Sequence, residues 1–145
     1  MFIEYKNEFD KKYNEKLNNT GVFWAFSNEQ FEENKTHKDA PDDEYIAVGM
    51  GGYIHKSNKD KFNNFFEVEL PKLRNEFISK INMEDMIEYE LKNHECFYTG
   101  NYLEIADIIS SFYNLPLVEI CEKIKNIYYE KMKSMSDIDD MHIDI

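Results

Sequence analysis

Residues 45–55 read Tyr-Ile-Ala-Val-Gly-Met-Gly-Gly-Tyr-Ile-His and place a glycine cluster between two short apolar runs. Such a cluster suits a hairpin or a bulge, because glycine adopts the positive φ angles that tight turns need. Upstream, residues 22–26 form an aromatic run of strand length, and Ser27 and Gln30 then make a capping-box pattern that begins a short helix through about Asn34. These segments predict a two- to three-stranded antiparallel sheet.

Helical periodicity dominates the rest of the chain. Apolar stripes predict helices over about residues 2–17, 57–80, 82–98, 103–112 and 117–132. Ser57 is interpreted as the cap of the second of these helices, and Pro71 predicts a kink or two abutting helices near Glu69. The fold class is α+β and predominantly helical, with the helices packed on one face of the small sheet. We predict one globular domain over residues 1–135 and an acidic, flexible tail over 136–145, where charges are too dense for a core element.

The composition of this 145-residue chain favours a folded protein of the cytosol. Hydrophobic residues make up 42% of it, enough to build a core without metal or disulfide staples. Two cysteines, Cys96 and Cys121, are too few for a disulfide framework. No apolar run has the length of a membrane span or the pattern of an export signal. The sequence also predicts no cofactor.

The formal net charge of −12 is spread unevenly. Residues 1–80 carry 15 acidic against 12 basic side chains, and residues 81–145 carry 14 against 5. Because an acidic surface repels phosphate, we expect no direct binding of nucleic acid. The surface is instead complementary to the basic groove of a nucleic-acid-binding protein, although a solvated exterior that aids solubility is the simpler interpretation. The proposed partner-binding residues are Glu119, Glu122, Asp137, Asp139 and Asp140.

One constellation invites a chemical interpretation. Glu90 and His94 lie four residues apart on a predicted helix and adjoin its apolar stripe, so both are expected to be partly buried. The functional interpretation makes them metal ligands or an acid–base pair, with Glu95, His55 or His37 completing the site. The structural interpretation is a hydrogen bond between carboxylate and imidazole near the helix C-terminus. We favour the structural interpretation, because a lone Glu-x-x-x-His match is frequent by chance.

Two other residues have competing interpretations. Cys96 follows His94 by two positions, a spacing that does not face two side chains on a helix, so a buried thiol is favoured over a nucleophile. Trp24 is interpreted as a core residue, the alternative being part of an aromatic surface for a partner.

Three motifs in order carry a resemblance. They are Gly21-Val-Phe-Trp-Ala-Phe-Ser-Asn-Glu-Gln-Phe31, Gly51-Gly-Tyr-Ile54, and Tyr89-Glu-Leu-Lys-Asn-His-Glu95 followed by Tyr98-Thr-Gly100. Over roughly residues 1–130 the chain resembles an uncharacterised family of small proteins from bacteriophages, prophages and other mobile elements of anaerobic bacteria. The family pattern has Phe-Phe where this chain has Phe23-Trp24, and Ala where it has Lys92. The resemblance names no activity, and it implies a mobile-element origin and a bacterial host cell.

These observations favour a non-enzymatic accessory protein that binds a host protein through its acidic surface, with inhibition of a host defence protein as one such role. Two alternatives come from other classes. One is a small metal-dependent enzyme centred on Glu90, His94 and Glu95. The other is a virion structural or assembly protein, in which the paired helices after Leu103 form a homo-oligomer.

Overall fold

The computed structural model describes residues 1–143, with side chains through residue 136. It confirms the α+β class: helices predominate, and one small antiparallel sheet is present. The chain divides into two compact units, an N-terminal unit of residues 3–77 and a C-terminal unit of residues 78 onward with Met1 and Phe2. The boundary falls within one helix, α4. Whether both units fold as the single domain we expected over residues 1–135 stays a prediction.

The sheet of the N-terminal unit is the predicted one, with strand order β1-β3-β2 and antiparallel pairing throughout. Its strands are β1 (Phe23–Trp24), β2 (Tyr45–Gly49) and β3 (Gly52–His55). Between β1 and β2 lie α2 (Asn28–Asn34) and the short 3₁₀ helix η1 (Asp42–Glu44). The capping box is confirmed, because Ser27 Oγ accepts a hydrogen bond from the Gln30 N–H at 3.1 Å.

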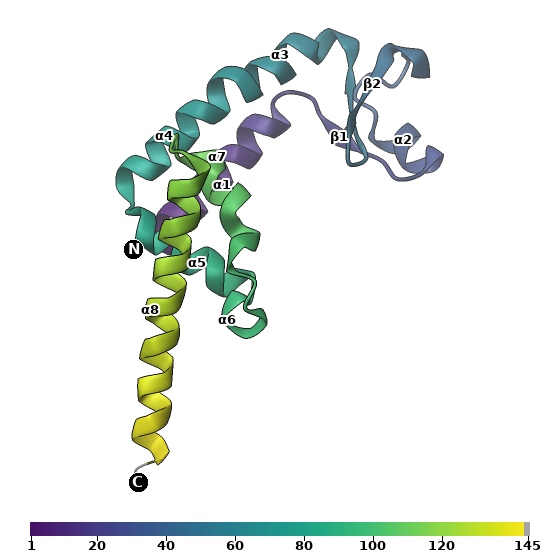
Figure 1. The fold of residues 1–145 in the computed structure, drawn as a ribbon. Helices are drawn as coiled ribbons and strands as arrows, with labels where there is room; N and C mark the ends of the chain where they lie inside the picture. Colours follow the sequence, from purple (N-terminus) through teal and green to yellow (C-terminus); the bar gives the residue numbers. More distant parts are fainter. Residues whose placement is uncertain (144–145) are drawn as a thin grey trace. The chain divides into compact units, whose positions relative to one another are not determined.

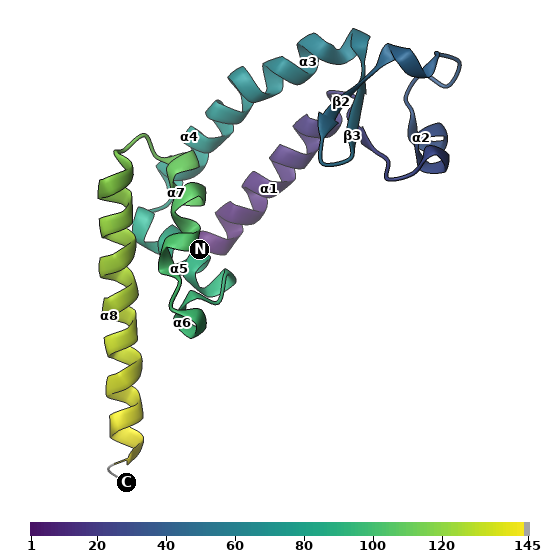
Figure 2. The ribbon, with the colours of Figure 1, turned by 45° about the vertical axis from the view of Figure 1, so that its right-hand side comes forward.

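A long, irregular helix leaves the sheet and pairs with α1 (Phe2–Asn18). It consists of η2 (Lys56–Asn58), α3 (Lys59–Asn64), the π-helical turn η3 (Phe65–Glu69) and α4 (Leu70–Lys80). The stripe of α1 packs on it, since Phe9 lies 5.3 Å from Phe77 and Tyr13 lies 5.3 Å from Phe65 between ring centroids. Figures 1 and 2 show α1 beside this helix. We expected a kink near Glu69, and the chain has the π turn there, which accommodates the missing N–H of Pro71 without a break.

The C-terminal unit is helical. It contains α5 (Met83–Asn93), α6 (Cys96–Thr99), η4 (Tyr102–Ile105), α7 (Ala106–Phe112) and α8 (Leu117–Ile143). Its fully buried side chains include Met86, Ile87, Leu91, Ile105, Ile109, Ile120 and Ile124, and all of these except Ile105 belong to the predicted apolar stripes. In both views α8 runs past α5 and α6 (Figures 1 and 2).

The helix α8 extends through Ile143, farther than its apolar stripe predicted. Once a helix is nucleated by packing, each further residue adds one hydrogen bond at little cost, so a stripe underestimates helix length. Residues 136–143 of the predicted tail are therefore helical. The flexibility of the tail stays a prediction. No helix in the part of the chain that the structure describes is long and apolar enough to cross a membrane.

Candidate functional site

The pair Glu90 and His94 lies at the C-terminal end of α5. Glu90 adjoins the buried stripe of α5, and only 5% of the residue is exposed to solvent. His94 is the C-cap residue, and its backbone N–H donates to the Glu90 carbonyl at 3.0 Å. The imidazole Nε2 lies 3.4 Å from Glu90 Oε2. The two side chains therefore lie close together, as both interpretations of the pair require.

A second carboxylate approaches the same imidazole from another element. Glu104 of η4 places Oε1 3.7 Å from His94 Nδ1. Glu95, which we named as the third member, instead lies in a left-handed conformation after α5 and lines a shallow pocket with Lys92, Phe97 and Tyr98. Both ring nitrogens of His94 thus face carboxylates, and this arrangement links α5 to η4.

The arrangement around His94 does not gather a ligand set. A metal ion bound at one ring nitrogen would reach only the carboxylate on that side, because the two nitrogens point in different directions. Within residues 1–136, no group of three or more His, Cys, Asp and Glu side chains is arranged to hold a metal ion. What the geometry supplies is a buried carboxylate beside a partly exposed imidazole at the end of α5, with Glu104 of η4 on the other side of the ring.

Cys96 begins α6 and its side chain is buried, as predicted. Burial raises the pKa of the Cys96 thiol, and the negative charge of Glu104 raises it further. A thiol with a raised pKa is mostly protonated at neutral pH and is a poor nucleophile. Cys96 therefore contributes to packing.

A second histidine cluster lies at the end of β3 in the N-terminal unit. The buried imidazole of His55 donates through Nε2 to Glu44 Oε2 at 2.9 Å. Its Nδ1 accepts the Ser57 backbone N–H at 3.2 Å and lies 2.7 Å from Ser57 Oγ. The hydrogen bond from His55 holds the pKa of Glu44 below its usual value. His37 stacks on His55 with ring centroids 4.0 Å apart.

This cluster corrects two expectations. His37 and His55, named as further members of the Glu90–His94 site, belong to a site of their own because each is tied to neighbouring residues. His37 exchanges hydrogen bonds with the Tyr45 hydroxyl, which donates to the His37 carbonyl at 2.7 Å. Ser57 is not the capping acceptor, since the cap of η2 is His55 Nδ1. Glu44 was not recognised, because it lies 11 residues before His55 and no local pattern links the two.

The second cluster is a helix cap, in which the His55 imidazole also lies beside the Ser57 hydroxyl. Serine hydrolases place the serine at Nε2 and the acid at Nδ1 of the catalytic histidine. Here the serine faces Nδ1 and the acid faces Nε2, and Nδ1 already accepts the backbone N–H of the same serine. The imidazole thereby fixes the start of η2 and joins it to η1.

The start of α8 carries the described part of the predicted acidic surface. Glu119 and Glu122 are both exposed. Val118, which shares their side of the helix, is 78% exposed. Leu115 and Leu117 are exposed beside it. We call these five residues the Val118 patch. The side chains of Asp137, Asp139 and Asp140 lie outside the described residues.

Most of the negative excess of residues 81–145 lies before α8. Residues 81–116 carry seven Asp and Glu and only one basic residue, Lys92, whereas α8 has four lysines between positions 123 and 133. Some of these charges are neutralised by pairing. Glu88 lies 3.1 Å from Lys92 and 3.3 Å from Lys131, and the hydrogen bond from Lys92 lowers its pKa most. Among the described side chains of α8, the acidic residues are Glu119 and Glu122 at its start and Glu130 among the lysines, and all three are exposed.

Comparison with known proteins identifies a family and no activity. No curated protein and no solved structure matches the chain. A family model described as a family of unknown function matches residues 5–134. That match covers both units, from α1 well into α8. The chain therefore belongs to the family of unknown function DUF7659.

Proposed function

We propose that this chain is a non-enzymatic accessory protein of a phage or mobile element, and that it binds a host protein through the Val118 patch. The observation that carries the proposal is the exposure of Val118 beside two exposed carboxylates, those of Glu119 and Glu122. An apolar centre with a polar rim is the usual composition of a protein–protein interface. Exposed apolar residues that lie together are a known sign of such interfaces.

The charge of the patch selects the kind of partner. Glu119 and Glu122 favour a surface that places Lys or Arg around an apolar pocket. The net charge of −12 adds a longer-range attraction toward basic proteins. A basic groove that binds nucleic acid meets both conditions, so an accessory protein seated there competes with nucleic acid. Inhibition of a nucleic-acid-dependent host defence protein is the role that follows.

The proposal extends along α8 to Asp137, Asp139 and Asp140. In the sequence no lysine follows Lys133, so these three acidic residues have no lysine near them along the chain. Their contribution is tested by variants, because their side chains lie outside the described residues.

Affinity capture from a bacterial host lysate, quantified by mass spectrometry at low and high salt, tests the proposal. The tested variants are Val118→Ser, the double variant Glu119→Lys/Glu122→Lys, and the triple variant that changes Asp137, Asp139 and Asp140 to Asn. A matched double variant, Glu4→Lys/Glu67→Lys, makes the same charge change on exposed carboxylates outside the patch.

The expected result is one or more partners whose capture weakens in high salt and is lost in the Val118→Ser and Glu119→Lys/Glu122→Lys variants. The matched double variant should retain them. Nucleic acid added to the lysate should displace the chain from the partner. Capture that is identical in all four variants contradicts the proposal. The origin is tested separately by the genes next to those of family members, which should encode phage or mobility functions.

A further inference from the structure

Two imidazoles stack face to face at the end of β3, within the N-terminal unit. The rings of His37 and His55 lie 4.0 Å apart between centroids, with 26° between their planes. His55 is buried and His37 is exposed. His37 belongs to the segment of residues 36–41, which connects α2 to η1. The stack therefore joins this connecting segment to the sheet.

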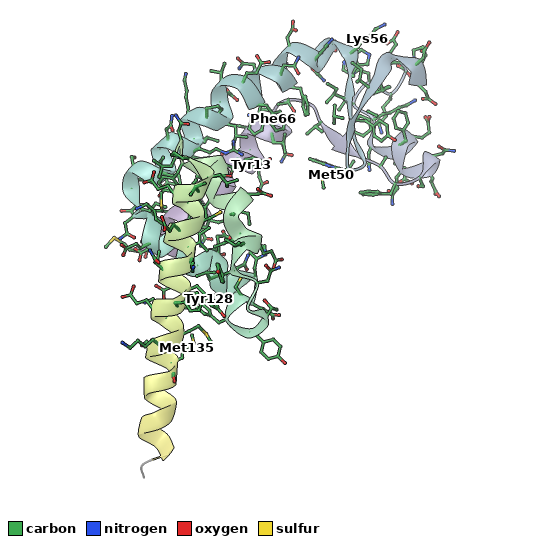
Figure 3. All side chains as sticks on the ribbon, in the orientation of Figure 1. Tyr13, Met50, Lys56, Phe66, Tyr128 and Met135 are labelled. Carbon is green, nitrogen blue, oxygen red and sulfur yellow. The ribbon has the colours of Figure 1, made fainter. Side chains whose placement is uncertain are left out.

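One negative charge lies beside the stack. His55 Nε2 donates to Glu44 Oε2 at 2.9 Å, and this bond holds the pKa of the Glu44 carboxyl below its usual value. Lys56, labelled in Figure 3, follows His55 in the chain and adds a positive charge within electrostatic reach of Glu44. The Tyr45 ring of β2 meets His55 edge-on with centroids 5.2 Å apart, and tyrosine is uncharged at neutral and acidic pH. These groups compensate one imidazolium and not two.

The other charges of the neighbouring elements are engaged elsewhere. Asp42 of η1 lies 3.7 Å from Lys35. Lys38 of the connecting segment donates to the backbone carbonyl of Glu32 at 3.2 Å. Among the described residues no second carboxylate forms an ion pair with either imidazole, and this includes the carboxylates of Asp39, Asp43 and Asp60.

A first proton is accommodated by hydrogen-bond partners that are already in place. Histidine takes up its proton between about pH 5 and pH 8, and the Glu44 carboxylate favours the charge on His55. A charged His55 donates from Nε2 to Glu44 and from Nδ1 to Ser57 Oγ, which lies 2.7 Å away. A neutral His37 ring on its face brings no opposing charge. The singly charged stack therefore stays closed.

A second proton on His37 has no such compensation. His37 Nδ1 lies 3.0 Å from the Thr36 hydroxyl, which carries no charge. Two imidazolium rings with centroids 4.0 Å apart repel each other, because like charges at this distance destabilise one another. The exposed His37 can turn into water, whereas His55 is buried and hydrogen-bonded at both nitrogens. The second charge therefore separates His37 from His55.

Separation weakens the remaining hold on the connecting segment. The His37 N–H donates to Tyr45 Oη at 3.0 Å, and the Tyr45 hydroxyl donates to the His37 carbonyl at 2.7 Å. Both bonds are exposed, so water competes for them. Tyr45 itself is held on the sheet, since its ring also packs edge-on against Phe31 of α2 at 5.2 Å between centroids.

We propose that the His37–His55 stack is a pH-dependent switch: residues 36–41 lie on the sheet while at most one imidazole is charged, and separate from it when both are charged. Acid favours the open form because the open form binds one proton more. The ratio of closed to open molecules therefore falls by up to about tenfold per pH unit once histidines charge. The switch lies away from the Val118 patch and does not rest on the proposed function.

NMR spectroscopy of the whole chain, titrated from about pH 7.5 to about pH 5, tests the switch across the range in which histidine charges. The readout is the nuclear Overhauser cross-peak between the carbon-bound ring protons of His37 and His55. The reference is the cross-peak between Phe23 and Phe31, whose ring centroids lie 5.6 Å apart in the same unit. We expect the histidine cross-peak to disappear below about pH 6 while the phenylalanine cross-peak persists, which distinguishes opening from unfolding.

Two variants separate the charge from the stacking. His37→Phe keeps an aromatic ring that cannot be charged, so its contact with His55 should persist at about pH 5. Glu44→Gln removes the carboxylate that favours charge on His55, so His55 stays neutral to lower pH and its contact with His37 should persist to lower pH than in wild type. Glu29→Gln makes the same charge change on an exposed residue of α2 and should behave as wild type.

Four results would overturn the proposal. The first is a wild-type histidine cross-peak that is absent at about pH 7.5 or unchanged down to about pH 5. The second is loss of the Phe23–Phe31 cross-peak together with the histidine one, which would mean that acid unfolds the unit. The third is a His37→Phe protein that loses its contact with His55 as wild type does. The fourth is separation at the same pH in Glu44→Gln and wild type.

Discussion

Replacing Met50 by glycine should make the protein more stable. Met50 is 95% exposed, so its side chain contributes almost no buried area to the fold. Its φ of 51° is a conformation that glycine adopts freely. The substitution therefore relieves backbone strain without opening a cavity.

The magnitude follows from two opposing terms. A left-handed conformation costs a residue with a Cβ roughly 1–2 kcal/mol. Glycine gains extra conformational freedom in the unfolded chain, which reduces the benefit by roughly 0.5–1 kcal/mol. The difference predicts that Met50→Gly raises the free energy of unfolding by about 0.5–1 kcal/mol.

Urea denaturation monitored by Trp24 fluorescence is the suitable assay, because Trp24 lies on the same small sheet as the turn. Met50→Ala is the control: it removes the same exposed side chain but keeps a Cβ in the left-handed region, so its stability should stay within about 0.5 kcal/mol of wild type. A Met50→Gly protein no more stable than Met50→Ala would refute the assignment of strain to this position.

Three further predictions concern the buried and titrating groups. His94→Ala leaves the Glu90 carboxylate buried without its imidazole, so the free energy of unfolding, measured in urea, should fall by about 2 kcal/mol. The lowered pKa of Glu44 means that its bond to the imidazole contributes stability above the unfolded pKa of about 4.3 and loses it as pH falls through the folded value. Glu44→Gln should therefore flatten the acid limb of the stability–pH curve below about pH 5. Iodoacetamide at pH 8 should alkylate the partly exposed Cys121 well before the buried Cys96, whose pKa is raised, and mass spectrometry of the folded protein reads this order directly.

The parts of the fold that could be predicted from the sequence are those encoded locally. The glycine cluster predicted the turn between β2 and β3, because the left-handed backbone angles of this turn disfavour most other residues. The Ser27–Gln30 capping box placed the start of α2 to the residue. The irregularity before Pro71 followed from the missing N–H of proline. In each case the signal and its structural effect lie within a few positions of one another.

The partners of the two histidines could not be predicted in this way. Glu104 reaches His94 from η4, and Glu44 reaches His55 across 11 residues of chain. Glutamate is common on this acidic chain, so composition offers many candidate partners for each histidine. Only the tertiary arrangement of α5 with η4, and of η1 with β3, selects between them.

The exposure of Trp24 shows a second limit of sequence patterns. Successive side chains of a strand point to opposite faces of the sheet, so Phe23 and Trp24 lie on different faces. This alternation does not show which of the two side chains is buried. In the structure Phe23 packs against Phe31 of α2, with ring centroids 5.6 Å apart. Trp24 lies on the other face and is 42% exposed, although Ile54 of that same face is buried. An aromatic run read as core thus supplies one core residue and one surface residue.

A charge count over a long segment does not locate the charges within it. The excess of −9 belongs to residues 81–145 as a whole, and in α8 four lysines and Glu130 lie between Glu122 and Asp137. Exposed charges interact over about one Debye length, roughly 8–10 Å at physiological salt. The 15 residues from Glu122 to Asp137 span roughly 22 Å of helix at 1.5 Å per residue. Helix positions 122 and 137 are therefore too far apart for charges at both positions to act as one field.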